Sequence, residues 1–297
     1  MSNANTLVSY ILLSYNHRDY VRQAVESIVN QDYSPIELIV VDDGSTDGSL
    51  KILRELQRAH GFTLIEKANG GIVSSVNISV PLAKGEYVVL HASDDISHPN
   101  RTAEQVAALM KNPEVGFTVG GIRKINGNGD VLEGWSEAEI KRYRFSDFYQ
   151  RRAKVHAVSC MYRACAIKKV MPLDESLSFE DIQLYWRVTD LGLDCLYDSQ
   201  IKAVDYRVVE NSLGRRDKAI HNISAIKFLE NYKDRDWYGC ALKREKTTLL
   251  ITLARSRKFE CIKYFYHEND FDIVRSFKAL LFLLLPAKII RLLQKKF

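Results

Sequence analysis

Short apolar runs alternate with amphipathic stretches over about the first hundred residues, and this order constrains the fold more than any other feature. The runs that predict strands are residues 7–13, 36–41, 62–66 and 86–90. The stretches with apolar residues at helical spacing are residues 20–30, 49–60 and 71–83. This order predicts an α/β protein with a mainly parallel, doubly wound, Rossmann-like sheet and right-handed crossovers. In such sheets, ligands bind beyond the carboxyl ends of the strands.

Length, charge and cysteine content narrow the class of protein. The chain has 297 residues, enough for one large domain with an appendage. Its net charge of +5 is mild and no nucleic-acid-binding motif accompanies it, so we expect no nucleic-acid partner. The five cysteines contain no CxxC pair, which indicates reduced thiols in the cytoplasm. The N-terminal segment lacks the basic region and cleavage site of a signal peptide.

Two acidic pairs follow predicted strands. Asp42 and Asp43 come directly after residues 36–41, where a carboxylate can accept hydrogen bonds from a nucleobase or a ribose. Asp94 and Asp95 come shortly after residues 86–90, and adjacent carboxylates of this kind suit Mg²⁺ or Mn²⁺. Each pair has a plainer explanation, because aspartate is common in turns and at the start of helices.

A third acidic pair, Glu180 and Asp181, opens a stretch that is predicted to be helical. A carboxylate here can be a general base that takes a proton from an acceptor hydroxyl. It can equally stabilise the helix N-terminus electrostatically.

Taken together, these segments closely resemble the family 2 glycosyltransferases, which have the GT-A fold. The resemblance spans about residues 6–213, with several motifs in the right order and spacing. The matching motifs are Ser14-Tyr15-Asn16, Asp42-Asp43-Gly44-Ser45, Asn69-Gly70-Gly71, Asn77, Ser93-Asp94-Asp95 and Glu180-Asp181.

The resemblance implies a role for each matching residue. Asp42 resembles the carboxylate that binds the nucleobase, and Asp181 resembles the catalytic base, with Glu180 beside it. Asp94 and Asp95 resemble the carboxylates that hold the metal, Mg²⁺ or Mn²⁺, and the ribose-diphosphate. The full nucleotide-sugar-binding set that it implies is Ser14, Tyr15, Asn16, Asp42, Asp43, Asn69, Asn77 and Asp94.

The implied activity is an inverting transfer of a sugar from a UDP- or dTDP-sugar to a hydroxyl of a saccharide or lipid-linked acceptor. Bacterial surface polysaccharide synthesis, such as that of O-antigen, is the setting that the family suggests. A nucleotidyltransferase is disfavoured, because the loop of residues 14–18 has no glycine.

Three positions depart from the family pattern. His91 stands where the metal motif often begins with Asp, Val209 where a His is often found, and Val76 where an Arg usually precedes Asn77. Arg207 or His221 could compensate for the missing His. The departures leave open a catalytically weak protein of the same fold that binds nucleotide sugars or acts as a scaffold.

We expect a catalytic domain at residues 1–215, with nucleotide-sugar binding at about 1–100 and the acceptor side at about 101–215. Within it, Asn126-Gly127-Asn128-Gly129 predicts a hairpin turn. A helical region follows at residues 216–297. Its last part, about residues 273–297, combines an apolar run too short to span a bilayer with basic residues and no acidic ones. This composition favours peripheral attachment to the inner face of the plasma membrane; a helix packed on the core is the alternative.

Overall fold

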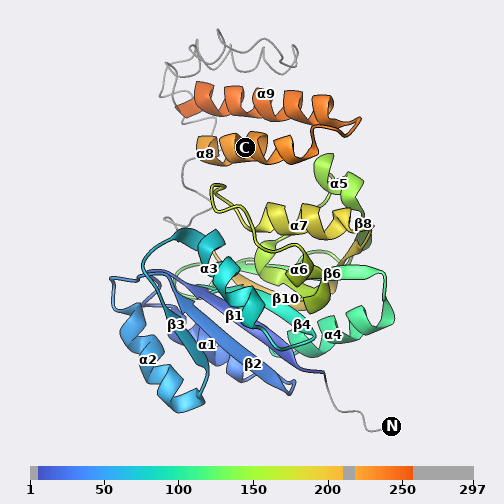
Figure 1. The fold of residues 1–297 in the computed structure, drawn as a ribbon. Helices are drawn as coiled ribbons and strands as arrows, with labels where there is room; N and C mark the ends of the chain where they lie inside the picture. Colours follow the sequence, from blue (N-terminus) through green and yellow to red (C-terminus); the bar gives the residue numbers. More distant parts are fainter. Residues whose placement is uncertain (1–5, 210–217, 257–297) are drawn as a thin grey trace. The chain divides into compact units, whose positions relative to one another are not determined.

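The computed structural model describes residues 6–209 and 218–256 (Figure 1). The chain divides into two compact units. The first comprises residues 1–175 and 180–210, and the second comprises residues 176–179 and 211–297. All of the predicted site residues belong to the first unit.

A ten-stranded sheet forms the centre of the first unit, with the strand order β3-β2-β1-β4-β9-β6-β10-β5; β7 pairs with β6 and β8 with β10. The strands are β1 (Val8–Ser14), β2 (Ile36–Asp42), β3 (Thr63–Glu66), β4 (Tyr87–Ala92), β5 (Ile96–Ser97), β6 (Val115–Ile125), β7 (Val131–Glu133), β8 (Ile140–Tyr143), β9 (Cys160–Arg163) and β10 (Asp194–Arg207). Strands β1 to β4 pair in parallel, and so do β6 and β10. Strand β9 is antiparallel to both β4 and β6, so β6 and β10 run in the same direction as the first four strands. The sheet is therefore mainly parallel, as the sequence predicts.

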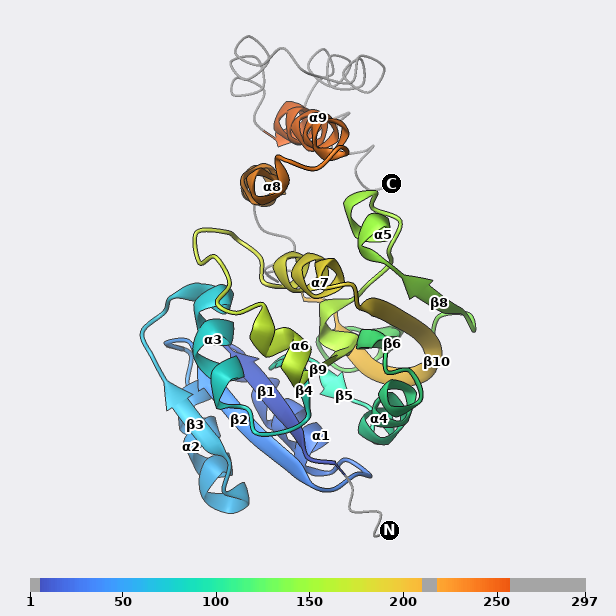
Figure 2. The same ribbon diagram turned by 45° about the vertical axis from the view of Figure 1, so that its right-hand side comes forward.

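Helices cover both faces of this sheet (Figures 1 and 2). The helices of the first unit are α1 (Val21–Val29), α2 (Ser49–His60), α3 (Gly71–Ser79), α4 (Arg101–Lys111), α5 (Phe145–Tyr149), α6 (Ala164–Lys169) and α7 (Asp181–Asp190), with short 3₁₀ helices η1 (Val80–Leu82) and η2 (Ala157–Ser159). Alternate residues of β1, β2 and β4 pack with α1, α2 and α4 in one buried core. Helices α3 and α6 lie over the opposite face (Figure 2).

The expected helix of residues 71–83 is shorter in the structure. Helix α3 ends at Ser79, and residues Val80–Leu82 form the 3₁₀ helix η1. Pro81 explains the change, because proline has no N–H to continue the α-helical hydrogen bonding. The expected hairpin turn is present, since Asn126 N–H donates to the carbonyl of Asp130 at 2.9 Å between β6 and β7.

The second unit contains helices α8 (Lys218–Leu229) and α9 (Tyr238–Ser256), with the 3₁₀ helix η4 (Glu230–Tyr232) between them. Phe179 contributes to this unit by stacking on His221 and meeting Phe228 edge to face. Among the described residues, no helix has the length and apolar character needed to cross a bilayer. The basic segment of residues 273–297 lies outside the described residues.

Candidate active site

Strands β2, β1 and β4 are neighbours, and their carboxyl ends bring the first two acidic pairs to one edge of the sheet. In the parallel register, Ser14 lies opposite Asp42 and Leu13 lies opposite Ala92. Asp43 follows β2 directly, and Asp94 and Asp95 follow β4. Residues about fifty positions apart in the sequence therefore lie at the same edge of the sheet, on the two sides of β1, where ligands bind in α/β sheets.

The loop after β1 is tied to the loop after β2. The carbonyl of Ser14 accepts the N–H of Asp43 at 2.8 Å. Asn16 has a φ of 55°, a left-handed conformation that Asn tolerates well. Its backbone N–H donates to Ser45 Oγ at 2.9 Å, and its side-chain oxygen accepts the N–H of Thr46 at 2.8 Å. Tyr15, half-buried, stands between these anchored positions.

Asp42 has one satisfied oxygen and one unsatisfied oxygen. Its side chain is 1% exposed, and Oδ1 accepts the N–H of Ser45 at 2.9 Å. Oδ2 is buried without a hydrogen-bond partner among the described residues, and so is Ser14 Oγ on the neighbouring strand. Unpaired buried polar atoms are rare in proteins and costly, so this pair is a candidate site for ligand donors.

Asp43 faces a different partner, the loop before α3. Its carboxylate forms an ion pair with Lys67 and accepts the N–H groups of Gly70 and Gly71, both at 2.9 Å. Asn69 is exposed within the same loop. Asp43 therefore fixes the Asn69-Gly70-Gly71 loop beside the β2 end, a contact that the sequence analysis did not foresee.

Asn77 holds a segment of the chain in the structure. Its side-chain nitrogen donates to the carbonyl of Leu173 at 3.0 Å and to the Glu175 carboxylate at 2.9 Å. Its side-chain oxygen accepts the N–H of Leu173 at 2.7 Å. These bonds connect α3 with the segment that leads to α7.

In the second acidic pair, the Asp94 side chain is partly exposed and Asp95 is buried. The Asp94 side chain is 12% exposed, and its Oδ2 lies 3.7 Å from Nε2 of His17. His17 is held by a 2.8 Å contact between Nδ1 and Ser93 Oγ. Asp95 Oδ1 accepts the backbone N–H of Arg207 at 2.7 Å. Burial and the neighbouring Asp94 raise the pKa of Asp95 well above its usual value.

The donor chemistry of this pair suits a hard divalent cation. Carboxylate oxygens are the ligands that Mg²⁺ and Mn²⁺ prefer, and such ions are commonly held by one or two carboxylates together with substrate phosphates. A cation would also relieve the repulsion between Asp94 and Asp95. No cluster of three or more acidic, His or Cys side chains suited to a metal occurs within residues 6–209 and 218–256.

His91, which departs from the family metal motif, and Arg207 and His221, which could compensate for the missing His, all have other partners. His91 faces the core on β4, where burial and the charge of Arg101 lower its pKa to about 3. Its Nδ1–H donates to the carbonyl of Ala92 at 2.7 Å. The guanidinium of Arg207 binds backbone carbonyls and Gln23. His221 belongs to the second unit, where its Nδ1 lies 3.1 Å from Ser178 Oγ.

The third acidic pair stands at the start of α7. Asp181 is the first residue of the helix, and its Oδ1 accepts the N–H of Ile182 at 2.7 Å. Burial and the charge of Asp181 raise the pKa of Glu180 to about 8. Asp181 also contributes to the raised pKa of the Cys160 thiol, at the start of β9. Strand β9 is the sheet neighbour of β4, the strand that leads to Asp94 and Asp95.

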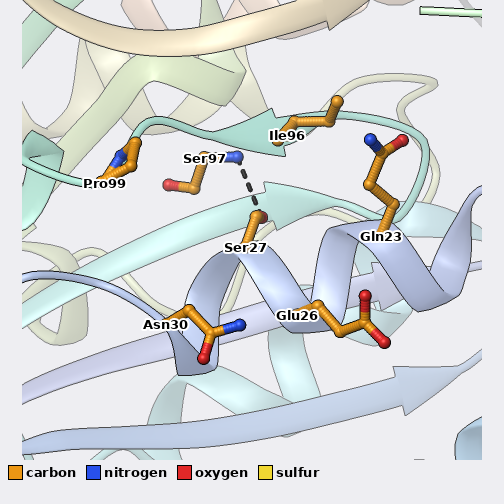
Figure 3. A pocket seen from close by; sticks show the side chains of 7 residues that line it. All are labelled: Gln23, Glu26, Ser27, Asn30, Ile96, Ser97 and Pro99. Atoms are coloured by element: carbon orange, nitrogen blue, oxygen red, sulfur yellow. Dashed lines mark hydrogen bonds between the residues drawn. The ribbon is translucent and has the colours of Figure 1, made fainter.

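A hollow of about 290 Å³ between α1 and β5 is separate from this arrangement (Figure 3). Its lining residues are Gln23, Glu26, Ser27, Asn30, Ile96, Ser97 and Pro99. None of the predicted nucleotide-sugar or catalytic residues lines it, so we do not assign it to the donor. A second hollow, near Arg163 and Lys168, contains none of them either.

Comparison with known sequences gives one family. Residues 9–177 match the sequence model described as Glycosyl transferase family 2. An uncharacterized glycosyltransferase of Rickettsia typhi is 28% identical over 275 residues, which cover 89% of this chain and 81% of the relative. One of Rickettsia bellii is 30% identical over 63% of this chain but only 28% of its own length. The poly-beta-1,6-N-acetyl-D-glucosamine synthase of Staphylococcus epidermidis is 24% identical, over 70% of this chain and 51% of the length of the synthase.

Comparison with solved structures supports the same fold. S. aureus TarS 1-349 in complex with UDP-GlcNAc superposes with a TM-score of 0.66, at 18% identity, over 88% of this chain and 78% of that one. The mannosyltransferase PcManGT from Pyrobaculum calidifontis, in complex with GDP-Man and Mn²⁺, has a TM-score of 0.59 at 16% identity, over 99% and 89% of the two chains.

Proposed function

This chain belongs to glycosyltransferase family 2, and from that premise we propose that it transfers a sugar, with inversion, from a UDP- or dTDP-sugar to a hydroxyl of a saccharide or lipid-linked acceptor. The observation that carries the proposal is the placement of Asp42 and the Asp94–Asp95 pair at the carboxyl ends of β2 and β4, the two parallel strands that flank β1. The complexes of its structural neighbours with UDP-GlcNAc and GDP-Man support a nucleotide-sugar donor.

The donor would be bound by the loops after β1, β2 and β4. Oδ2 of Asp42 has no partner among the described residues and can accept the imide N–H of a uracil or thymine ring. Asp43 keeps the Asn69-Gly70-Gly71 loop in place, and Asn16 keeps the two neighbouring loops together. Asp94 and Asp95 would hold Mg²⁺ or Mn²⁺, which neutralises charge on the departing nucleoside diphosphate.

The acceptor would be activated by Asp181. With its pKa raised to about 8, Glu180 is protonated at neutral pH, so the two adjacent carboxyl groups do not both carry a negative charge. Asp181 would accept the proton of the acceptor hydroxyl as the oxygen attacks the anomeric carbon and the nucleoside diphosphate leaves. A positioned base of this kind contributes on the order of 10²–10⁴-fold to a reaction rate.

Two observations support a biological setting for this activity: the name of one relative and the sequence of residues 273–297. A relative named as a polysaccharide synthase supports bacterial surface polysaccharide, of which O-antigen is one kind, as the product. The basic, apolar residues 273–297 support attachment to the inner face of the plasma membrane, where a lipid-linked acceptor is met.

A nucleotide-sugar screen with Mn²⁺ tests the activity. We expect hydrolysis or transfer with at least one UDP- or dTDP-sugar, and we expect an Asp94→Ala, Asp95→Ala double variant to lose it by on the order of 100-fold or more. The control is an Asp234→Ala, Asp236→Ala double variant, which removes two exposed aspartates from the second unit. Full activity in the first double variant contradicts the assigned cation site. Tight UDP binding without turnover on any acceptor favours the catalytically weak binding protein.

A further inference from the structure

Arg207, the last residue of β10, connects the acidic loop after β4 with two other segments. Its side chain is 2% exposed. The guanidinium donates from Nε to the carbonyl of Asp94 (2.8 Å), from Nη1 to the carbonyls of Asn126 (3.0 Å) and Gly127 (2.9 Å), and from Nη2 to Oε1 of Gln23 (2.8 Å). Its backbone N–H donates to Oδ1 of Asp95 at 2.7 Å.

These contacts join three parts of the first unit that are remote in sequence. Asp94 and Asp95 precede β5, Asn126 and Gly127 form the β6–β7 turn, and Gln23 lies on α1. Figure 3 shows Gln23 on the α1 side of the hollow, with Ile96 on the strand across it. The guanidinium also lies over the ring of Tyr20, with its central carbon 4.6 Å from the ring centre.

The guanidinium of Arg207 is buried, and the hydrogen-bond acceptors named above are backbone carbonyls and the Gln23 amide, with no acidic side chain among them. These four hydrogen bonds go to neutral acceptors, and burying a cation among neutral groups costs free energy. The carboxyl group of Asp95 lies beside this cation, because its Oδ1 accepts the backbone N–H of Arg207 at 2.7 Å. Arg207 therefore contacts both members of the acidic pair, Asp94 through its side chain and Asp95 through its backbone.

The same geometry leaves little of the guanidinium for a ligand. Four hydrogen bonds occupy it, and it is buried. Any effect of the guanidinium on a bound nucleotide must therefore pass through the groups that it binds, and among these the carbonyl of Asp94 belongs to the acidic pair.

We propose that Arg207 is a positioning residue that fixes the Asp94–Asp95 pair for its cation and diphosphate, and that couples the pair to the β6–β7 turn and to α1. This inference rests on the proposed function, because it takes the pair as the cation site. Partners that orient metal ligands commonly change metal affinity on the order of 10–100-fold when they are mutated.

The chain contains a matched control. Arg163, at the end of β9, also binds backbone carbonyls with its guanidinium, those of Val115 (2.7 Å), Leu109 (2.6 Å) and Asn112 (3.0 Å). It also lies over a tyrosine ring, that of Tyr87, at 5.9 Å. Its partners belong to α4 and the start of β6 rather than to the acidic loop, so it has the chemistry of Arg207 without the acidic pair.

The experiment compares Arg207→Lys with Arg163→Lys in the full chain. Calorimetry measures UDP affinity with and without Mn²⁺, and a thermal melt measures stability. We expect Arg207→Lys to weaken Mn²⁺-dependent UDP binding on the order of 10–100-fold. We expect Arg163→Lys to lower the melting temperature while the UDP affinity changes less than about 2-fold. Millimolar guanidinium should restore UDP affinity to Arg207→Ala, because the ion can occupy the space that the side chain leaves beside the Asp94 loop. The UDP affinity of Arg163→Ala should not respond to guanidinium.

The outcomes distinguish a failure of the proposed function from a failure of the positioning role of Arg207. If the wild-type chain binds neither UDP nor dTDP with Mn²⁺, the proposed function fails. If the wild type binds but Arg207→Lys binds equally well, or if both arginine variants lose affinity only in proportion to stability, the positioning role fails. Should Arg207→Lys not fold, Gln23→Ala removes one partner of the guanidinium and keeps the charge. It should weaken Mn²⁺-dependent UDP binding by about 3-fold or more, and an unchanged affinity overturns the inference.

Discussion

Adjacent aspartates in this chain have different surroundings, and the difference predicts different defects. Oδ2 of Asp42 has no partner among the described residues, whereas the carboxylate of Asp43 is paired with Lys67 and two backbone N–H groups. Asp42→Asn replaces an acceptor with a donor, so we expect UDP affinity to fall on the order of 10-fold while stability changes little. Asp43→Asn should chiefly lower the melting temperature, because it loosens the loop before α3.

Calorimetry with UDP and a thermal melt on both variants check this prediction. The reverse pattern, in which Asp43→Asn abolishes UDP binding and Asp42→Asn leaves it unchanged, would assign the base-binding role to Asp43.

His91 predicts an acid sensitivity of the fold. Its pKa is lowered to about 3 in the folded chain, by burial and by Arg101, against 6.5 for an ordinary histidine. As the pH falls below 6.5, the unfolded chain therefore binds a proton at His91 while the folded chain does not. The free energy of unfolding decreases progressively as a result, until the folded chain is also protonated near pH 3. Between pH 7.5 and 4.5, this effect is on the order of 2–3 kcal/mol of unfolding free energy.

Urea unfolding of the wild type and of His91→Asn at the two pH values measures the effect. Asn keeps a donor for the Ala92 carbonyl but does not titrate, so the variant should lose less stability on acidification than the wild type. Equal losses would show that His91 is not the residue responsible.

At the scale of elements, the loop after β2 depends on a glycine. Gly44 has a φ of +76°, and a Cβ there would lie 2.8 Å from the backbone nitrogen of Asn69. Gly44→Ala should therefore cost roughly 1–3 kcal/mol of unfolding free energy and also weaken UDP binding, because the loops after β2 and β3 must separate.

Gly61→Ala is the control for backbone conformation alone. Gly61 has a φ of +71°, and a Cβ there would meet no atom within 4 Å. Urea unfolding should show a smaller loss for Gly61→Ala, with UDP affinity unchanged. Equal losses in the two variants would mean that close packing against Asn69 contributes nothing.

The elements that the sequence predicts are those whose signals are local. The parallel strands near the N-terminus and the hairpin turn at residues 126–129 follow from apolar runs and from turn residues. Strand β9, only Cys160–Arg163 in length, has too little sequence to predict its antiparallel place between β4 and β6. The same limit applies to the site: its acidic pairs have motifs, but the bonds from Asn77 to Leu173 and from Arg207 to Asp95 cross about 100 residues.

At the scale of the whole molecule, the two units carry different chemistry. The predicted donor and catalytic residues all lie in the first unit. Residues 273–297, which belong to the second unit, are basic and apolar in sequence, and this composition favours attachment to a membrane surface. Basic side chains near an anionic surface contribute about 1 kcal/mol each, and apolar side chains add to this by entering the headgroup region.

Removing residues 275–297 should therefore release the chain from phosphatidylglycerol vesicles in a flotation assay. Binding by the full chain should weaken as salt is added, because the attraction is screened. Lys295→Gln with Lys296→Gln should lower binding by on the order of 10-fold or more. Lys51→Gln with Arg58→Gln removes the same charge from the exposed face of α2 and should change it little. Undiminished binding after the deletion, or equal effects of the two double variants, would mean that the net charge of the molecule rather than this segment holds it at the membrane.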